Sequence, residues 1–481
     1  MRAFVFFRLI FVVLGVVGCA LLLPLCVSVF LGETQMTLPF LLPLIFSVIF
    51  AAFFFFRGRK RSVKFSVRSV YLFVALTWIS ISLFGSIPLY ASGFFDSYSD
   101  ALFESVSGFS TTGATILKSV ENLPKSLNLW RCEMHWLGGM GIIALTVALL
   151  PLLGIDGFQL IKAETTGPEK GKITPKMANT AEVLWILYFA FTVVHALILF
   201  FLGMNPIDSI AHAFSSVSTG GFSTRDSSIA YYNSPAIEWT CAIFMFLSGV
   251  NFSLYFYLLT KKYVDVRRNS ELKAYILLVL VSSVIVSILI LAPSGDFFSA
   301  FRKAFFQVVS VITSTGYSTA DYQLWHPAAQ FVLFALFFVG GSSGSTAGGF
   351  KVVRWCVLFK HAKNEMLRLL HPHGVFSLRL DGRSGRRDLV GNVAAFAFVY
   401  AVLVFVTTFL GTLARLDIFS AFATALSMVG NVGLSFGELG PGASFDFLPS
   451  FLKLWYCFAM IAGRLELYNM LIFFLREYWR K

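Results

Sequence analysis

Four short glycine-containing segments, each between long apolar stretches, hold the residue types that could do chemistry in this chain. They read Ser110-Thr111-Thr112-Gly113-Ala114, Val217-Ser218-Thr219-Gly220-Gly221, Thr313-Ser314-Thr315-Gly316-Tyr317 and Gly430-Asn431-Val432-Gly433-Leu434. Their central glycines are 107, 96 and 117 residues apart, and three of the four follow hydroxyl side chains. Glycine adopts positive φ without steric cost, so such a segment can aim backbone carbonyls at one point. Four segments around an axis would form a ring of oxygens that replaces the water shell of a cation.

The composition is that of a membrane protein. Of 481 residues, 57% are hydrophobic and 13% are charged, about half the charged fraction of soluble domains. The formal net charge is +13, and the basic residues concentrate between apolar stretches. That distribution is typical of cytosolic loops and does not indicate nucleic-acid binding. The six cysteines form no CxxC pair, so neither a disulfide framework nor a zinc site is supported.

Ten apolar stretches predict membrane spans, since about 20 such residues cross a bilayer. They are Phe4–Leu31, Leu38–Phe56, Val70–Tyr90, Leu129–Leu153, Ala181–Leu202, Ala236–Leu259, Ala274–Leu291, Ala328–Phe359, Leu389–Leu413 and Phe451–Leu475. The basic run Arg57–Arg61 follows the second span and places that loop in the cytosol. Both termini are then cytosolic, and all four glycine segments face the other side. The first stretch lacks a small-residue cleavage motif, so we expect an uncleaved helix there.

After the first two spans, one pattern occurs four times: span, short amphiphilic helix, glycine segment, span. The short helices are expected near Asp100–Phe109, from Asp208, near Ala300–Ile312 and near Phe419–Val429. The predicted fold is an all-α polytopic membrane protein with four span–pore-loop–span repeats around one pore plus an N-terminal helix pair. Residues 1–66 form the pair. The repeats are 67–160, 161–268, 269–387 and 388–481, the third with a broken second helix and a basic cytosolic loop.

The repeats can be aligned on their central glycines. Six residues before the glycine, three repeats have Ser107, Ser310 and Ser427, whereas the second has Phe214; twelve before it stand Ala101, Ala304 and Ala421, whereas the second has Asp208. Weak identity with consistent placement is expected of diverged internal repeats. Each short helix is too short to cross the membrane but can enter and turn back. Its C-terminal end would then favour a cation at the axis. Ordinary extracellular loops are the alternative, and four matching segments disfavour it.

A second motif, Gly340-Gly341-Ser342-Ser343-Gly344-Ser345-Thr346-Ala347-Gly348-Gly349, interrupts the long apolar stretch Ala328–Phe359. Each of its five glycines disfavours helix by up to ~1 kcal/mol relative to alanine, so the stretch should break within the membrane. A phosphate-binding loop is disfavoured, because Phe350 precedes the lysine and Val352 follows it. Close helix packing through small residues stays an alternative. Lys351 and Arg354 follow the motif as pore-proximal groups or cytosolic anchors, and we favour anchors.

Arg464 lies about midway along the last span. A charge at that depth costs at least ~2.5 kcal/mol even on a lenient insertion scale. It is either half of a structural ion pair, with Glu466 or another carboxylate, or a positive charge that faces the pore and slows cation passage.

The chain resembles the Trk/Ktr/HKT superfamily of potassium transporters over essentially its whole length. The resemblance rests on Ser107-Gly108-Phe109-Ser110-Thr111-Thr112-Gly113-Ala114-Thr115, Trp136-Leu137-Gly138-Gly139-Met140-Gly141, Ser218-Thr219-Gly220-Gly221-Phe222-Ser223-Thr224, Thr313-Ser314-Thr315-Gly316-Tyr317 and Gly430-Asn431-Val432-Gly433. The extra N-terminal pair of spans is similar to the TrkH/TrkG branch.

This resemblance implies potassium uptake across an inner membrane, with K⁺ as the transported ion, no other cofactor and no enzymatic activity. The implied filter, where K⁺ binds, consists of Thr111, Thr112, Gly113, Ser218, Thr219, Gly220, Ser314, Thr315, Gly316, Asn431, Val432 and Gly433. Serine at the first glycine position accompanies sodium preference in plant relatives, so glycine at all four favours K⁺. The fourth segment lacks the hydroxyls of the others, which makes the site only approximately four-fold.

The resemblance also implies a gate below the filter, formed by Gly340–Gly349, and a pore barrier at Arg464. The implied partners are a second copy of the chain and a separate cytosolic nucleotide-binding subunit (TrkA-like). The basic stretch from Lys360 to Arg387 could dock that subunit or bind anionic lipid. A secondary transporter of another cation or solute, coupled to protons or sodium, is the alternative function. Such folds usually have two inverted halves rather than four parallel hairpins. A membrane enzyme would need a buried acidic or histidine cluster that the spans hardly offer.

Overall fold

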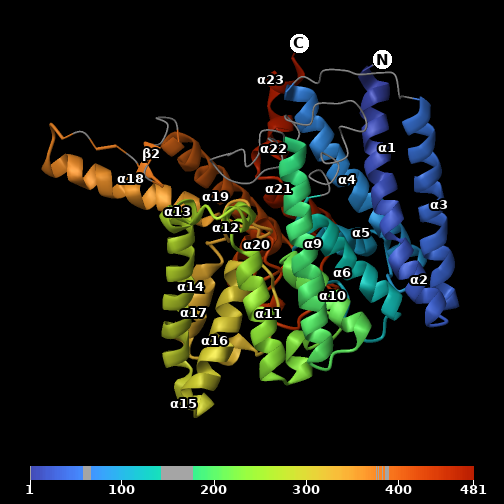
Figure 1. Cartoon of the computed structure of the whole chain (residues 1–481), viewed down its shortest axis with the longest axis horizontal. Coiled ribbons are helices and arrows are strands. Elements are labelled where there is room, and N and C mark those ends of the chain that lie inside the picture. Colours follow the sequence, from blue (N-terminus) through green and yellow to red (C-terminus); the bar gives the residue numbers. More distant parts are fainter. Residues whose placement is uncertain are drawn as a thin grey trace.

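The protein is a bundle of helices in which short helices lie inside longer ones (Figure 1). The computed structural model describes residues 2–57, 67–141, 177–374, 376–377, 379–381, 383–384 and 389–480. Within them the strands are β1 (Arg379–Leu380) and β2 (Arg383–Ser384), an antiparallel pair of two residues each. The predicted all-α fold is therefore confirmed. The predicted divisions after residues 66, 160 and 387 and the end of the span Leu129–Leu153 lie outside the described residues.

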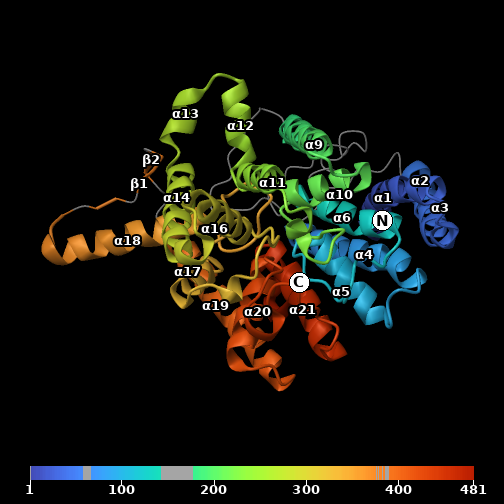
Figure 2. The same ribbon diagram turned by 90° about the horizontal axis from the view of Figure 1, so that it is seen from below.

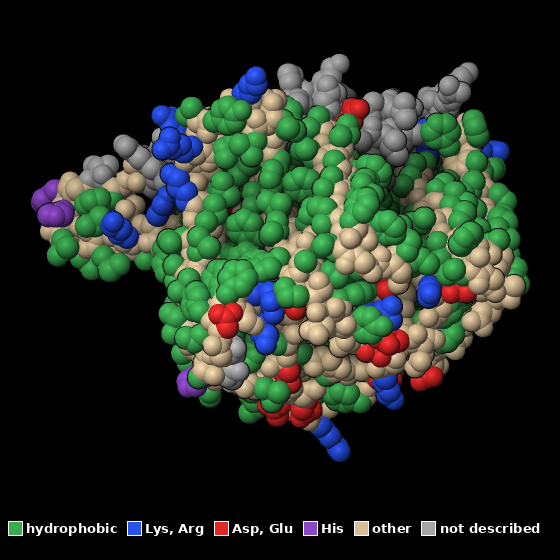
Figure 3. Space-filling model, turned by 60° about the horizontal axis from the view of Figure 1, so that its bottom comes forward, with side chains coloured by type: hydrophobic (Ala, Val, Ile, Leu, Met, Phe, Trp, Pro, Cys, Tyr) green, Lys and Arg blue, Asp and Glu red, His purple; other side chains and the backbone are tan. Residues whose placement is uncertain are grey.

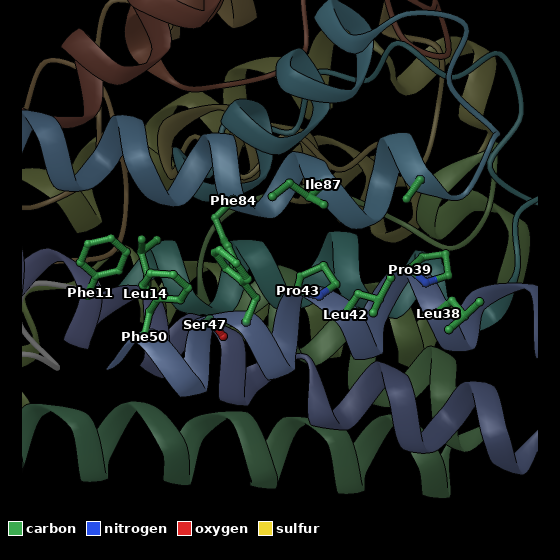
Figure 4. A pocket seen from close by; sticks show the side chains of 12 residues that line it. Phe11, Leu14, Leu38, Pro39, Leu42, Pro43, Ser47, Phe50, Phe84 and Ile87 are labelled. Atoms are coloured by element: carbon green, nitrogen blue, oxygen red, sulfur yellow. The ribbon is translucent and has the colours of Figure 1, made fainter. Parts of the chain in front are cut away.

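The N-terminal helices form a layer at one side of the bundle (blue in Figures 1 and 2). This layer consists of α1 (Arg2–Ala20), α2 (Leu22–Phe30) and α3 (Thr34–Arg57). Gly15 and Gly18 let α1 approach α3 closely, since a Cβ on Gly18 would stand 1.7 Å from Ser47 Oγ. A groove of about 500 Å³ between α1, α3 and α4 (Figure 4) is apolar except for Ser47, whose hydroxyl donates to Leu44 O at 2.9 Å.

Four helical units surround one axis in the view from below (Figure 2). Each has an outer helix, a short helix and an inner helix. The outer helices are α4 (Val67–Ala91), α9 (Met177–Phe201), α14 (Ser270–Leu289) and α19 (Leu389–Leu413). The short helices are α5 (Tyr98–Phe109), α10 (Pro206–Val217), α16 (Phe297–Ile312) and α20 (Ile418–Gly430). The inner helices are α6 (Lys125–Gly139), α11 (Pro235–Ser248), α17 (Pro327–Leu336) and α21 (Ser450–Arg464).

The remaining helices connect or extend these units. They are α12 (Phe252–Leu259), α13 (Tyr263–Arg268), α15 (Leu291–Ser294), α18 (Val352–Leu370), α22 (Tyr468–Leu471), α23 (Arg476–Trp479) and the 3₁₀ turns Ser228–Tyr232, Tyr322–Leu324, Gly437–Leu439 and Ile472–Phe474. Helix α18 projects away from the bundle in both views (Figures 1 and 2).

The short helices start where the sequence supplies a capping side chain. Ser97, Asn205, Asp296 and Asp417 are the N-cap residues of α5, α10, α16 and α20, and each accepts a hydrogen bond from a first-turn amide. Such a cap satisfies one of the free N–H groups at a helix start. Hydrogen bonding by Ser420 lowers the pKa of the Asp417 carboxyl, which keeps it charged at the start of α20.

Among the described residues, six helices are long and apolar enough to cross a membrane, or up to eight if each bent pair counts as one span. Two further predicted spans are described only in part or in pieces: α6 ends at Gly139, and Ala328–Phe359 is divided between α17 and α18. Hydrophobic side chains form a broad area on the surface in Figure 3, and most of the visible acidic groups lie toward the end opposite the basic cluster beside α18.

All four inner helices end early, after 15, 14, 10 and 15 residues. The sequence predicted a break only in the third unit. Continuous spans over Ala236–Leu259 and Phe451–Leu475 were wrong, because the chain bends by 89° between α11 and α12 and by 119° between α21 and the segment after it. Positive φ angles at Glu466 (60°) and Leu467 (49°) make the second bend.

The contact between α5 and α6 depends on Gly138. A Cβ there would stand 1.8 Å from Phe109 O, a backbone atom that cannot move aside. We expect Gly138→Ala to lower the free energy of unfolding by about 1–3 kcal/mol, because the added methyl group overpacks this contact. The melting temperature of the detergent-solubilised protein should fall accordingly. Gly391→Ala on α19 is the control, because no atom lies within 4 Å of that Cβ. Equal melting temperatures for the two variants would contradict this packing.

Candidate cation pathway

The four glycine segments meet in a closed ring. A Cβ on Gly113 would stand 2.2 Å from Gly220 O, one on Gly221 2.0 Å from Thr315 O, one on Gly316 2.3 Å from Val432 O, and one on Gly433 2.1 Å from Thr112 O. Each segment thus lies against the next, and the fourth lies against the first. Because only hydrogen fits between neighbours, the backbones themselves form the wall of the ring. We call residues 110–114, 217–221, 313–317 and 430–434 the glycine ring.

The same type of turn joins each short helix to its ring segment. Thr111, Thr219, Ser314 and Asn431 have φ angles of 56°, 54°, 53° and 54°. The amide that follows each of them donates to the carbonyl five residues earlier, from Thr112 to Ser107 at 2.9 Å, Gly220 to Ser215 at 2.8 Å, Thr315 to Ser310 at 2.9 Å and Val432 to Ser427 at 2.9 Å. This is the Schellman pattern of a helix C-terminus. The four chains therefore leave their helices in the same way.

The second segment is displaced by one residue from the sequence alignment. The ring glycines with positive φ are Gly113 (84°), Gly221 (92°), Gly316 (81°) and Gly433 (80°), each two residues after the left-handed turn residue. Gly221, not Gly220, is therefore the backbone equivalent of the others. Counting six residues back from Gly221 gives Ser215, which matches Ser107, Ser310 and Ser427. That serine was the signal that the alignment on Gly220 missed.

A chamber of about 510 Å³ lies on one side of the ring, and the same four positive-φ glycines line it. Its wall also carries Lys118, Arg225, Asp226 and Asp321. This chamber gives access to the ring from the side that the glycine segments face.

Several hydroxyl groups of the ring bind the ring's own chain. Thr112 Oγ1 lies 2.7 Å from Ser110 Oγ, Thr219 Oγ1 donates to Ser218 O at 2.6 Å, and Ser314 Oγ donates to Thr313 O at 2.6 Å. In the fourth segment Asn431 Nδ2 donates to Thr112 Oγ1 at 3.0 Å and to Met460 O at 2.9 Å. The fourth segment thus replaces hydroxyl contacts with an amide that joins it to the first.

A buried ion pair supports the first two segments. Arg131 on α6 lies 2.6 Å from Glu104 on α5, and their side chains are 1% and 0% exposed. Glu104 also accepts hydrogen bonds from Thr115 Oγ1 at 2.9 Å and from the N–H of Ile116 at 3.0 Å. The guanidinium carbon of Arg131 lies 4.3 Å from the ring centre of Phe222. The pair therefore connects the chain on both sides of the first junction of the ring.

His135 supports the second segment from behind. Its Nε2 accepts the N–H of Phe222 at 3.2 Å, so Nδ1 carries the proton and donates to Gly108 O at 2.7 Å. A Cβ on Gly220 would stand 2.3 Å from the His135 ring. Sequence reasoning missed this residue and the Glu104–Arg131 pair, because their partners are remote in the chain. Among the described residues no group of three or more His, Cys, Asp or Glu could hold a metal ion.

The segment Gly340–Gly349, here called the intramembrane loop, lies on the other side of the ring. Thr346 Oγ1 donates to Val217 O at 3.1 Å and to Ser248 O at 3.2 Å, and the N–H of Gly348 donates to Ser314 Oγ at 2.5 Å. A Cβ on Gly348 would stand 2.6 Å from Gly430 O. The loop therefore contacts the ends of three of the four short helices or their turns.

The intramembrane loop also forms hydrogen bonds with the chain at the break between α11 and α12. The N–H of Ser342 donates to Gly249 O at 2.9 Å, and the N–H of Phe252 donates to Gly344 O at 3.0 Å. Backbone groups freed inside a membrane need such partners.

Arg464 reaches across from α21 to two other units. One guanidinium nitrogen donates to Thr346 O at 2.7 Å, and the other donates to Gly138 O at 2.8 Å and Gly139 O at 2.7 Å. Glu466 forms its ion pair with Arg354. Arg464 thus connects the intramembrane loop with the end of α6.

Lys351 and Arg354 are not cytosolic anchors, and that prediction was wrong. Their side chains are buried, and Lys351 Nζ donates to Ala347 O inside the loop. Both follow the loop directly, so the break carries them inward, toward Glu466 and the loop carbonyls.

The apolar helices around the ring of backbone segments define a multi-pass helical membrane protein. Residues 39–481 match the family model TrkH, described as a cation transport protein. The chain is 37% identical to the Trk system potassium uptake protein TrkH of Halomonas elongata over 435 residues, which cover 89% of this chain and 90% of that one. It is 34% identical to TrkG of Escherichia coli (strain K12), with 96% and 95% covered. The crystal structure of the potassium transporter TrkH from Vibrio parahaemolyticus superimposes with a TM-score of 0.87 at 31% identity, covering 100% of both chains.

The chain belongs to the TrkH family. The resemblance to the TrkH/TrkG branch is thereby confirmed. The family is one of transporters.

The Glu104–Arg131 pair predicts a large effect of charge removal. We expect Arg131→Met to destabilise the protein by about 3–5 kcal/mol, because Glu104 is left buried without its partner. Thermal stability in detergent measures this, and the double variant Arg131→Met/Glu104→Gln should recover part of the loss. The control is Lys118→Met, which removes a pair with Asp446 whose lysine side chain is 80% exposed. An Arg131→Met protein as stable as Lys118→Met would rule out this role of the pair.

Proposed function

We propose that this chain takes up potassium ions through the glycine ring, which acts as the selectivity filter. The single observation that carries the proposal is the closed contact of four backbone segments with the same turn geometry. Rings of backbone carbonyls replace the hydration shell of a cation. The C-terminal ends of α5, α10, α16 and α20 point their partial negative charge toward the same place. Filter residues are the twelve predicted from the sequence together with Gly221.

Potassium is the cation that the relatives' names support, since those from Halomonas elongata and Escherichia coli are potassium uptake proteins. Glycine at all four ring positions agrees with this choice. The ion dehydrates between the outer chamber and the ring. The hydroxyls of Thr219 and Ser314 donate to backbone carbonyls of their own segments and hold the chain in place. K⁺ is the transported ion rather than a resident cofactor.

The intramembrane loop is the gate, and Arg464 is a barrier beside it. The loop contacts units two, three and four, and Arg464 extends the contact to Gly138 and Gly139 of unit one. The path below the ring is thus bridged on all sides. A positive charge in this position also repels a cation that leaves the filter.

The basic runs support an inner-membrane location with both termini in the cytosol. The division of the chain into five parts stays a prediction. Homodimerisation and a TrkA-like nucleotide-binding subunit are the proposed associations. Helix α18 supports them, because it projects from the bundle with Phe359, Met366, Leu369 and Leu370 more than half exposed.

Uptake of rubidium or potassium by liposomes that contain the purified protein tests the function. We expect uptake that follows the cation gradient. A requirement for a proton or sodium gradient would favour a coupled secondary transporter, and no uptake by correctly inserted protein would contradict the proposal.

The displaced second segment predicts which glycine sets selectivity. We expect Gly113→Ser and Gly221→Ser to reduce the preference for K⁺ over Na⁺, because both side chains would meet a ring carbonyl in a left-handed conformation. Gly220→Ser places its side chain against His135, so selectivity should change less than in Gly221→Ser. The measurement is the ratio of rubidium to sodium uptake. A larger change in selectivity in Gly220→Ser than in Gly221→Ser would support the sequence alignment on Gly220 instead.

The position of Arg464 predicts faster cation passage when its charge is removed. A barrier lower by about 1.4 kcal/mol speeds passage roughly tenfold, and we expect an increase of that order in basal uptake for Arg464→Gln. Arg464→Lys retains the charge and should increase uptake less. Slower uptake in Arg464→Gln than in Arg464→Lys, at equal protein in the membrane, would show that Arg464 is needed for structure alone.

A further inference from the structure

We propose that Glu271 is a positioning residue that latches the intramembrane loop to the start of α18, so that the loop and α18 move together. This inference rests on the proposed function, in which the loop is the gate. The sequence did not single out Glu271, and its role comes from contacts with residues 72 and 82 positions further along the chain.

One oxygen of Glu271 holds both sides of the loop. Glu271 lies in the first turn of α14 and is 7% exposed. Its Oε1 accepts the N–H of Ser343 at 2.6 Å and the N–H of Val353 at 3.2 Å. Ser343 lies within the loop, and Val353 lies in the first turn of α18. A single carboxylate therefore joins the gate, α18 and α14.

Helix α18 lacks a cap from its own sequence. Its N-cap residue, Lys351, makes no side-chain capping bond. The first amides find partners elsewhere: the N–H of Val352 donates to Gly341 O at 3.2 Å, and the N–H of Val353 donates to Glu271. Free N–H groups and the partial positive charge at a helix start favour a carboxylate there. Glu271 is thus the cap of α18, supplied by another helix.

A second carboxylate completes the connection in the reverse direction. Asp381, in the hairpin after α18, accepts the N–H of Ser270 at 2.6 Å at the start of α14. Each helix start is therefore bound by a carboxylate from the other part of the chain. A rigid-body movement of α18 away from α14 therefore acts on the bond from Val353 to Glu271, and Glu271 transmits it to Ser343 of the loop.

The cations nearby bind other acceptors and leave the Glu271 carboxylate to these two amides. Lys351 donates to Ala347 O, and Arg354 is paired with Glu466. Three charged groups thus hold the loop at separate points: Glu271 at Ser343, Arg464 at Thr346 and Lys351 at Ala347. Lys351 is itself the N-cap residue of α18, whereas Glu271 joins the loop and α18 from another helix.

The test is rubidium uptake by liposomes containing the full-length protein without added partners. We expect Glu271→Gln to raise basal uptake several-fold, because an uncharged amide binds the two N–H groups more weakly and the loop is released. The ratio of rubidium to sodium uptake should stay that of the unchanged protein, since the ring is not altered. The matched control is Glu182→Gln, the same substitution at an exposed position on α9, which should leave uptake as it was.

A second variant covers the case in which Glu271→Gln does not fold. Asp381→Asn weakens the reverse bond at an exposed position and should raise uptake in the same direction by a smaller factor. Unchanged or reduced uptake in both variants, with the unchanged protein active, would overturn the latch and leave the proposed function standing. An unchanged protein without uptake would overturn the function and the latch with it.

Discussion

Where four backbones meet so closely that only hydrogen fits between them, side chains cannot shape the space. At each junction of the glycine ring a glycine faces a carbonyl of the next segment at a distance that excludes a Cβ. The rest of the molecule holds these four segments in contact. The short helices end in one turn geometry, and Glu104, Arg131 and His135 support the chain behind the ring. A buried charge pair is costly, but here it satisfies the backbone that leaves the ring.

The end of the ring that faces the intramembrane loop depends on a second constraint, that backbone polar groups in a membrane need partners inside the protein. All four inner helices end early and free such groups. The loop satisfies those at the α11–α12 break, and Arg464 satisfies the last carbonyls of α6. Arg464 and Lys351 therefore act on backbone carbonyls in this apolar bundle. The same contacts that satisfy the broken helices also bridge the path below the ring, so structural need and the proposed gate involve the same residues.

Symmetry in this protein belongs to the backbone and not to the side chains. The four turns agree in φ within a few degrees, although Thr111, Thr219, Ser314 and Asn431 differ in chemistry. Asparagine tolerates the left-handed region better than the β-branched threonine does, yet both adopt it here. A carbonyl ring needs only this backbone agreement. The units can therefore diverge widely while the ring remains, which explains the weak identity between them.

The sequence by itself determined the all-α membrane fold, the four glycine segments, the short helices before them and the break at Gly340–Gly349. These follow from local properties: apolar length, capping side chains and glycine content. Only the tertiary structure decided that Gly221 takes the ring position, that the other inner helices also break and that Lys351 and Arg354 lie buried. Each of these depends on contacts between units about a hundred residues apart. A backbone can turn inward at Gly249 because the N–H of Ser342 in the next unit satisfies its carbonyl, and no local pattern records that neighbour.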